Sequence, residues 1–337
     1  MVVAIISDWD ADGVVSAAQV LYSQGILGVY PLRGKHSVVL VPASVRSIVD
    51  AAEEIVGKGA SYAVVLDIAY SRYTDKAFGY LRSNNVEVLY IDHHISTAIH
   101  IDAVKSKIKN VLVGRTSTAM LVYNQLKSIG VDVSERLKAF IEAVTVIERG
   151  ERRYSKQVSV KLIDIIASLS RALVNSKNRN LWIKVVQWLT EPLPFISLPF
   201  ALDITKFAKT SSEHLKELKA IANEIALSAK KIFDVRFIDI RGTKYPHKST
   251  AIASALHRLL KTPVVLLARN KRGDDILIIK SRGATAYDLA LYLYRKGIAE
   301  DIMGHQTLII MLLKPQVSPQ NIANYIREFL VNGPAGI

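Results

Sequence analysis

The stretch that decides the fold opens the chain: Met1-Val-Val-Ala-Ile-Ile-Ser-Asp8-Trp-Asp10-Ala-Asp12-Gly13. Its apolar run Val2–Ile6 predicts a buried strand. Three aspartates follow directly, and Gly13 allows close backbone approach at the turn into a helix. Parallel α/β sheets carry their functional groups at such strand ends, so we expect a site here.

Two later strand-like runs end in polar residues of the same kind. Asp67 follows the run 62–66, and Asp92-His93-His94 follows the run 86–91. The carboxyl ends of parallel strands share one edge of a sheet, so these groups are expected to converge with the first aspartates. Clustered carboxylates repel one another unless a cation lies among them. Carboxylates with one or two imidazoles suit Mn²⁺ or Mg²⁺, and a shared carboxylate allows two ions.

The first 115 residues alternate strand and helix, which predicts a doubly wound parallel sheet. The expected strands are 2–6, 37–42, 62–67, 86–91 and 110–113. The expected helices lie near 12–25, 45–57, 72–84 and 101–108.

The rest of the chain predicts a helical region and then a second, smaller α/β domain. The expected helices of the first region are 117–129, 134–147, 158–174 and 180–189, followed by a long charged helix at 211–232. Beyond it, strands are expected at 235–240, 263–268, 275–281 and 307–313, and helices at 249–260, 286–296 and 318–331. We therefore expect a first domain at 1–205 with a helical extension at 150–205, a linker helix at 206–232, and a C-terminal α/β domain at 233–337.

Charge is distributed unevenly along the chain. Residues 1–100 carry 7 Lys and Arg and 10 Asp and Glu, a net of −3. Residues 101–337 carry 37 and 20, a net of +17. An acidic cluster within a basic chain favours a phosphate-rich polymer as the partner, although solvated helix faces are the alternative use of these cations.

The composition also restricts chemistry and location. The chain has no cysteine, which excludes disulfides and thiol catalysis and favours a cytoplasmic protein. No apolar run is long enough to span a membrane and the start lacks a signal-peptide pattern, so we expect no membrane association. Many Ile, Val, Lys and Arg residues indicate a thermophile.

The motifs together resemble the DHH phosphoesterase superfamily, which includes RecJ-like single-strand nucleases, oligoribonucleases that also act on phosphoadenosine phosphates, cyclic dinucleotide phosphodiesterases and manganese inorganic pyrophosphatases. The first three family motifs match Asp10-Ala-Asp12-Gly13, Asp67 and Asp92-His93-His94. The resemblance implies that Asp10 and Asp12 each hold one metal and that Asp67 bridges both. It implies that His93 binds the second metal and His94 faces the substrate phosphate. Asp92 would orient the imidazoles.

Two positions depart from the family pattern. Many members have a histidine where this chain has Ile6, and Asp8 is the expected substitute, as in RecJ-like sequences. The fourth family motif usually supplies an Asp from a helical segment, and Val144–Glu148 is the best match. The resemblance therefore implies Glu148 as a metal ligand; a surface carboxylate at a helix end, beside Arg149, is the alternative interpretation.

The resemblance continues into a DHH-associated domain, which carries a Ser-Arg turn and a glycine-rich loop that ends in histidine. Ser281-Arg282 and Gly304-His305 occupy these places, although the loop lacks the usual preceding glycines. The resemblance implies that these residues bind substrate phosphates through charge-assisted hydrogen bonds. A packed structural role is the alternative for His305. Arg115 opens the segment Arg115–Thr118, which is either a phosphate site at a helix N-terminus or a plain Ser/Thr cap.

The resemblance implies a divalent-metal-dependent phosphoesterase with two Mn²⁺ or Mg²⁺ ions, in which Asp67 and His94 are catalytic. An exonuclease on single-stranded DNA or RNA is the first interpretation, because the basic surplus favours a polymer. An oligoribonuclease or phosphoadenosine-phosphate phosphatase is the second, and a non-catalytic replication-associated scaffold is the third. The implied partners are single-stranded nucleic acid or short oligonucleotides, together with replication or repair proteins.

Overall fold

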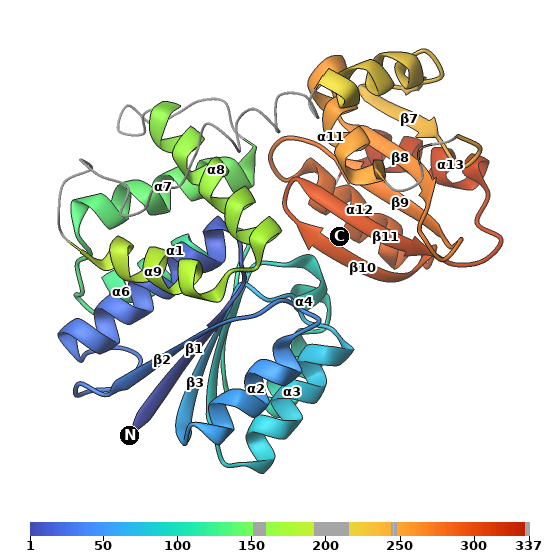
Figure 1. Cartoon of the computed structure of the whole chain (residues 1–337). Helices are drawn as coiled ribbons and strands as arrows, with labels where there is room; N and C mark the ends of the chain where they lie inside the picture. The colour runs from blue at the N-terminus through green and yellow to red at the C-terminus, as the bar shows by residue number, and fades with distance from the viewer. Residues whose placement is uncertain (151–159, 192–215, 244, 246–247, 334–337) are drawn as a thin grey trace. The chain divides into compact units, whose positions relative to one another are not determined.

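The computed structural model describes residues 1–150, 160–191, 216–243, 245 and 248–333. The chain divides into two compact units, Met1–Phe207 and Ala208–Ile337 (Figure 1). Parts of the expected helical extension and linker helix, at 151–159 and 192–215, lie outside the described residues. No helix in the described ranges has both the length and the apolar character needed to cross a membrane.

The first unit is built on a five-stranded parallel sheet in the order β2-β1-β3-β4-β5. Its strands are β1 (Val2–Ser7), β2 (Ser37–Pro42), β3 (Ala60–Leu66), β4 (Glu87–Asp92) and β5 (Asn110–Val113). The chain passes from β1 to β2 on one side and then to β3 on the other. The switch point of the sheet therefore lies between β1 and β3, where open α/β sheets bind their ligands.

Alternation along β1 explains why helices cover both faces of this sheet. Val3 and Ile5 are buried in one hydrophobic core, and Ala4 and Ile6 in the other. The first core is covered by α1 (Ala11–Leu21), α6 (Thr118–Ser128), α7 (Glu135–Arg149), α8 (Val160–Ser176) and α9 (Arg179–Thr190). The second is covered by α2 (Ile48–Gly57), α3 (Arg72–Ser83) and α5 (Ile101–Lys107). The expected doubly wound sheet is confirmed.

The second unit contains a six-stranded mixed sheet in the order β10-β11-β9-β8-β7-β6. Its strands are β6 (Lys230–Ile232), β7 (Val235–Asp239), β8 (Val264–Arg269), β9 (Asp275–Lys280), β10 (Ala299–His305) and β11 (Leu308–Leu313). Its helices include α11 (Ser249–Leu260), α12 (Thr285–Arg295) and α13 (Pro319–Asn332). Among the described strands of this unit, only β7 and β8 pair in parallel. The expected smaller C-terminal α/β fold is confirmed.

The structure corrects the sequence expectations at several elements. Helix 12–25 is divided into α1 and a π-helical segment, η1 (Tyr22–Leu27), and helix 101–108 is preceded by a short helix, α4 (Ile95–Ile99). The charged helix expected at 211–232 is helical only at 216–226 within the described residues, because 230–232 form β6. The segment 299–305, for which no strand was expected, is β10. Both missed strands lie at the edges of the sheet, where exposed charged residues hide the strand pattern.

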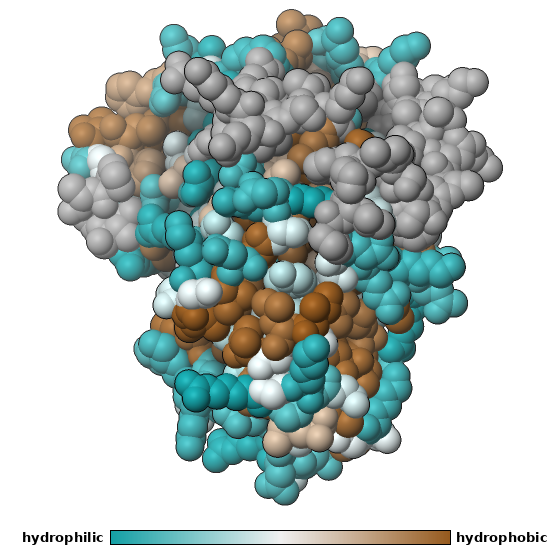
Figure 2. Space-filling model, turned by 90° about the vertical axis from the view of Figure 1, so that its left-hand side faces the viewer, coloured by the Kyte–Doolittle hydropathy of each residue, from teal (hydrophilic) through white to brown (hydrophobic). Residues whose placement is uncertain are grey.

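The surface of the molecule mixes hydrophilic and hydrophobic residues. Figure 2 shows hydrophobic residues gathered on one face of the first unit, bordered by hydrophilic side chains. Large hydrophobic side chains are exposed at Ile26, Leu27 and Val29, around the end of η1. Scattered exposed hydrophobic residues are normal in globular folds and by themselves identify no site.

Candidate metal centre

The loop between β1 and α1 brings the first three aspartates to the switch point of the sheet. Asp10 is the N-cap of α1, and its Oδ1 accepts a hydrogen bond from Gly13 N at 3.1 Å. Asp12 lies in the first turn of α1 and is buried. A Cβ atom on Gly13 would lie 2.5 Å from the carbonyl oxygen of Asp8. The close approach of α1 to this loop therefore requires glycine.

Two helices from the later part of the first unit hold this loop from outside. The indole Nε1 of Trp182, in α9, donates to the carbonyl oxygen of Asp8 at 3.1 Å. The hydroxyl of Ser170, in α8, accepts from Ala11 N at 3.2 Å. These contacts were not predicted from the sequence, because they join residues 174 and 159 positions apart.

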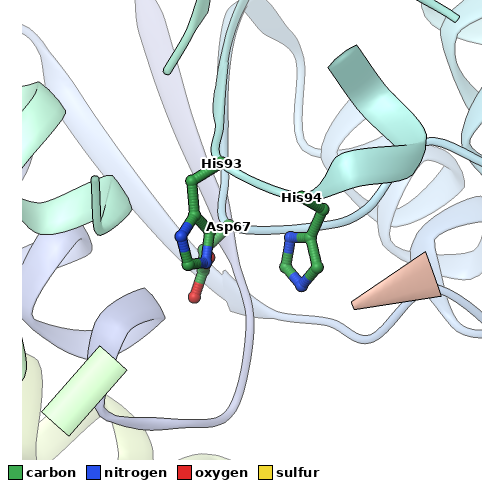
Figure 3. Close-up of side chains that lie close together, drawn as sticks. All are labelled: Asp67, His93 and His94. Carbon is green, nitrogen blue, oxygen red and sulfur yellow. The ribbon is translucent and has the colours of Figure 1, made fainter. Parts of the chain in front are cut away.

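Asp67 and His93 bring the second and third motifs together. Asp67 follows β3 with a left-handed backbone, φ 58°, and both side chains are buried. His93 Nε2 lies 3.3 Å from Asp67 Oδ1 and 3.6 Å from Asp12 Oδ2. Among the described residues, Asp67, His93 and His94 form a group whose ligand atoms all lie within 4.8 Å of one another (Figure 3). The predicted convergence of the motifs is therefore present in the fold.

Asp92 fixes the orientation of His94. The Asp92 carboxylate is fully buried and its Oδ1 accepts from His94 Nδ1 at 2.7 Å. Its Oδ2 accepts from the hydroxyls of Thr97 and Tyr90, the latter at 3.3 Å. Because Nδ1 donates to Asp92, Nε2 is the His94 nitrogen that remains for a metal or a substrate. The role of Asp92 in orienting the imidazoles of a metal site stays a prediction.

Helix α6 contributes a set of contacts that the sequence analysis missed. Asp12 accepts hydrogen bonds from two backbone N–H groups at the start of α6, Thr118 N to Oδ2 and Ala119 N to Oδ1, both at 2.7 Å. The Thr118 hydroxyl also donates to Asp67 Oδ1 at 3.0 Å. The sequence identified this segment as a helix start, but nothing in it indicated which carboxylates it would meet.

The buried carboxylates of this cluster favour a cation. Burial and the neighbouring Asp10 raise the pKa of Asp8 to about 7 and that of Asp12 to about 7. Burial and the neighbouring Asp12 raise the pKa of Asp67 well above its usual value. A carboxylate is destabilised here unless a proton or a metal ion neutralises it.

The two histidines have opposite electrostatic environments. Burial and the adjacent His94 lower the pKa of His93 to about 3, so its imidazole is neutral at physiological pH and can bind a metal. Burial alone would lower the pKa of His94. The carboxylates of Asp92, Asp8 and Asp10 outweigh this effect and raise it to about 9. The protonated form of His94 is therefore favoured among these carboxylates.

The donor set fits a hard divalent cation. Oxygen ligands from carboxylates with a neutral imidazole suit Mn²⁺ or Mg²⁺, and the raised carboxyl pKa values indicate that the cluster needs a compensating positive charge. Glu148 lies in the last turn of α7 and is not part of the compact group of Asp67, His93 and His94. Arg115 lies after β5 and is exposed.

The expected substrate-binding residues of the second unit also lie close together. Ser281 N donates to Thr307 O at 3.1 Å, and Lys280 pairs with Leu308, which in turn pairs with His305. The Ser281 hydroxyl accepts from Ala286 N at 2.8 Å, at the start of α12, and Arg282 is exposed.

The tight turn after β10 explains the glycine before His305. Gly304 has φ 118°, and a Cβ atom there would lie 2.2 Å from the carbonyl oxygen of Leu308. The Ser-Arg turn and the glycine–histidine pair, 23 residues apart between Ser281 and Gly304, thus lie at one end of the second sheet.

Comparisons with known proteins place the fold. No protein-family model matches the sequence, and no curated protein matches it significantly. Among solved structures, RecJ from Thermus thermophilus in complex with Mn²⁺ aligns with a TM-score of 0.58 and 13% identity, over 99% of this chain and 52% of RecJ. The DHH domain of a protein assigned to a family of ribosomal proteins aligns with a TM-score of 0.59 and 14% identity, over 97% of this chain and 86% of that one.

These similarities confirm the expected resemblance at the level of the fold. The chain has the two-part architecture of DHH proteins, and it spans about half the length of the RecJ chain.

Proposed function

We propose that the protein is a divalent-metal-dependent phosphodiesterase that degrades single-stranded DNA or RNA as an exonuclease. The convergence of Asp67, His93 and His94 at the carboxyl edge of a DHH-like sheet carries this proposal. The similarity in fold to Mn²⁺-bound RecJ supports it. The net charge of +14 favours a polyanionic substrate over a small diphosphate.

The ligand assignment combines the geometry of the cluster with the resemblance in motifs. We assign Asp67 as the ligand shared by two Mn²⁺ or Mg²⁺ ions, with Asp12 and His93 beside it. Asp8, Asp10 and Glu148 are assigned as the remaining ligands. When bound, such cations polarise phosphoryl oxygens and lower the pKa of water, which is the chemistry that phosphodiester hydrolysis needs.

The protein's own groups orient the substrate. His94 is held by Asp92 through Nδ1, and the same carboxylate raises its pKa, which favours a protonated Nε2. It is therefore suited to donate a hydrogen bond to a phosphoryl oxygen of the scissile group. Arg282, Ser281 and His305 are assigned to substrate phosphates, with Arg115 as a further phosphate contact.

The decisive experiment compares the wild-type protein with Asp67→Asn. Asparagine tolerates the left-handed backbone of residue 67, so the variant removes the charge without straining the chain. Labelled single-stranded DNA and RNA, marked at either end, are incubated with Mn²⁺ or Mg²⁺ and the product ladders compared. We expect stepwise shortening by the wild type and a loss of roughly a thousandfold or more in Asp67→Asn.

Asp75→Asn is the matched control, because Asp75 lies on α3 in an ion pair with Lys107, away from the cluster. It should retain normal rates. Near-normal turnover by folded Asp67→Asn would refute the metal-centre assignment. Cleavage of dinucleotides or phosphoadenosine phosphates without strand shortening would instead identify an oligoribonuclease-type enzyme. Absence of any hydrolysis with Mn²⁺ bound would indicate a scaffold.

A further inference from the structure

We infer that Thr118 is a positioning residue that fixes two carboxylates of the metal centre, Asp12 and Asp67, relative to each other. The inference rests on the proposed function, in which both carboxylates hold metal. Thr118 is the first residue of α6 and is completely buried. It lies 106 positions from Asp12 and 51 from Asp67, so only the fold brings the three together.

Thr118 contacts the two carboxylates through different atoms. Its backbone N donates to Asp12 Oδ2 at 2.7 Å, and its hydroxyl donates to Asp67 Oδ1 at 3.0 Å. The next residue, Ala119, donates its backbone N–H to Asp12 Oδ1 at 2.7 Å. The first N–H groups of a helix have no acceptor within the helix, so Asp12 takes them without breaking α6.

The start of α6 is itself firmly held. The Ser117 hydroxyl accepts from Met120 N at 3.3 Å as the helix cap and shares a 2.7 Å hydrogen bond with the Thr145 hydroxyl of α7. Thr145 is also bonded to the carbonyl of Ile141 at 2.8 Å. Thr118 therefore projects from a fixed point rather than from a free loop.

This arrangement addresses the main physical difficulty of the site, which is repulsion between buried carboxylates. A hydrogen bond from Thr118 engages one lone pair of Asp67 Oδ1 and leaves the remaining lone pairs for a cation. His93 Nε2 lies 3.3 Å from the same oxygen, so the carboxylate is restrained from two sides. Metal sites tolerate ligand displacements of only about 0.2 Å, and loss of a group that orients a ligand typically weakens affinity about 10–100-fold.

The test is Thr118→Val, which keeps the shape of the side chain and the backbone N–H to Asp12 but removes the hydroxyl. Isothermal titration with Mn²⁺ should show affinity about 10–100-fold weaker than in the wild type. Thr118→Ser retains a hydroxyl and should restore most of the affinity. Thr118→Ala also removes the hydroxyl, without adding the second methyl group that valine has, and should also bind Mn²⁺ weakly. It provides the same test if the valine variant does not fold.

The matched control is Thr74→Val. Thr74 is also completely buried in the first turn of a helix, α3, but its hydroxyl donates to Ala69 O at 2.8 Å and touches no carboxylate of the cluster. It should bind Mn²⁺ normally. Wild-type affinity in both Thr118→Val and Thr118→Ala would overturn the role of Thr118 alone. A wild-type protein that binds neither Mn²⁺ nor Mg²⁺ would overturn the proposed function, and this inference with it.

Discussion

Gly13→Ala is expected to damage the metal centre by pushing apart two segments of backbone. The new Cβ would lie 2.5 Å from Asp8 O, 2.8 Å from Asp8 N and 2.9 Å from Asp8 C. All three are backbone atoms, and the carbonyl is already held by Trp182 Nε1 at 3.1 Å. The loop cannot yield by rotating a side chain, so the loop or the start of α1 must move.

The size of the effect follows from these distances. Ordinary van der Waals contact begins at about 3.4 Å, so the backbone must separate by up to about 0.9 Å. Overpacking of this kind typically costs about 1–3 kcal/mol, and replacing glycine by alanine in a helix returns up to about 1 kcal/mol. We expect a net loss of about 1–2 kcal/mol, which lowers Tm by about 2–8 °C in a unit of this size.

The functional consequence should exceed the loss of stability. A shift of several tenths of an ångström separates Asp8 and Asp10 from Asp12, which is more than metal coordination tolerates. Thermal denaturation with and without Mn²⁺, together with Mn²⁺ titration, measures both effects. Affinity should fall by about tenfold or more.

Gly79→Ala is the control, because Gly79 lies exposed within α3 and a Cβ there meets nothing within 4 Å. It should leave Mn²⁺ affinity unchanged and raise stability by about 0.5–1 kcal/mol. A Gly13→Ala protein with wild-type Tm and wild-type Mn²⁺ affinity would refute the steric reasoning. A lowered Tm with unchanged Mn²⁺ affinity would show that the residues of the β1–α1 loop do not bind the metal.

Three further predictions concern the pH dependence, the fourth motif and the second unit. In chelator, Tm should fall from about pH 6.5 to 9, because the pKa of His94 is raised from 6.5 to about 9: the stability that this gives is fully present below the unfolded pKa and is lost as pH rises through the folded one. Saturating Mn²⁺ should flatten the profile. A metal-free Tm that is constant or rising over this window would contradict the cause assigned to the His94 shift. Glu148→Ala should weaken Mn²⁺ affinity and Glu148→Asp should retain part of it, whereas normal affinity in both would exclude Glu148 as a ligand. Arg282→Ala should raise KM for oligonucleotides more than it lowers kcat, and binding of oligonucleotides should weaken steeply with salt. Arg272 is exposed in the β8–β9 turn, and Arg272→Ala should change neither KM nor kcat. Equal effects of the two variants would show that only net charge matters.

The sequence determined the parallel sheet because its signals are local. Buried strands such as Val2–Ser7 are continuous apolar runs, and each is followed by a helix with a recognisable start. It also indicated which residues would meet, since Asp12, Asp67 and His93 all follow strands of one sheet. The edge strands β6 and β10 were missed, because an edge strand needs no continuous apolar face and its identity comes from its pairing partner.

The tertiary structure alone decided how the metal centre is supported. Thr118 and Trp182 carry ordinary local signals, a helix start and a core aromatic, and their contacts with Asp67 and with the carbonyl of Asp8 join distant parts of the chain. The same is true of the electrostatics, because the carboxylates of Asp92, Asp8 and Asp10 that the fold gathers around His94 raise its pKa against the opposing effect of burial. Residue type and local pattern specify which groups can bind a metal. The packing of α6 and α9 against the sheet specifies how those groups are held. The sequence could not predict this packing, because hydrogen bonds between distant residues leave no periodic pattern in it.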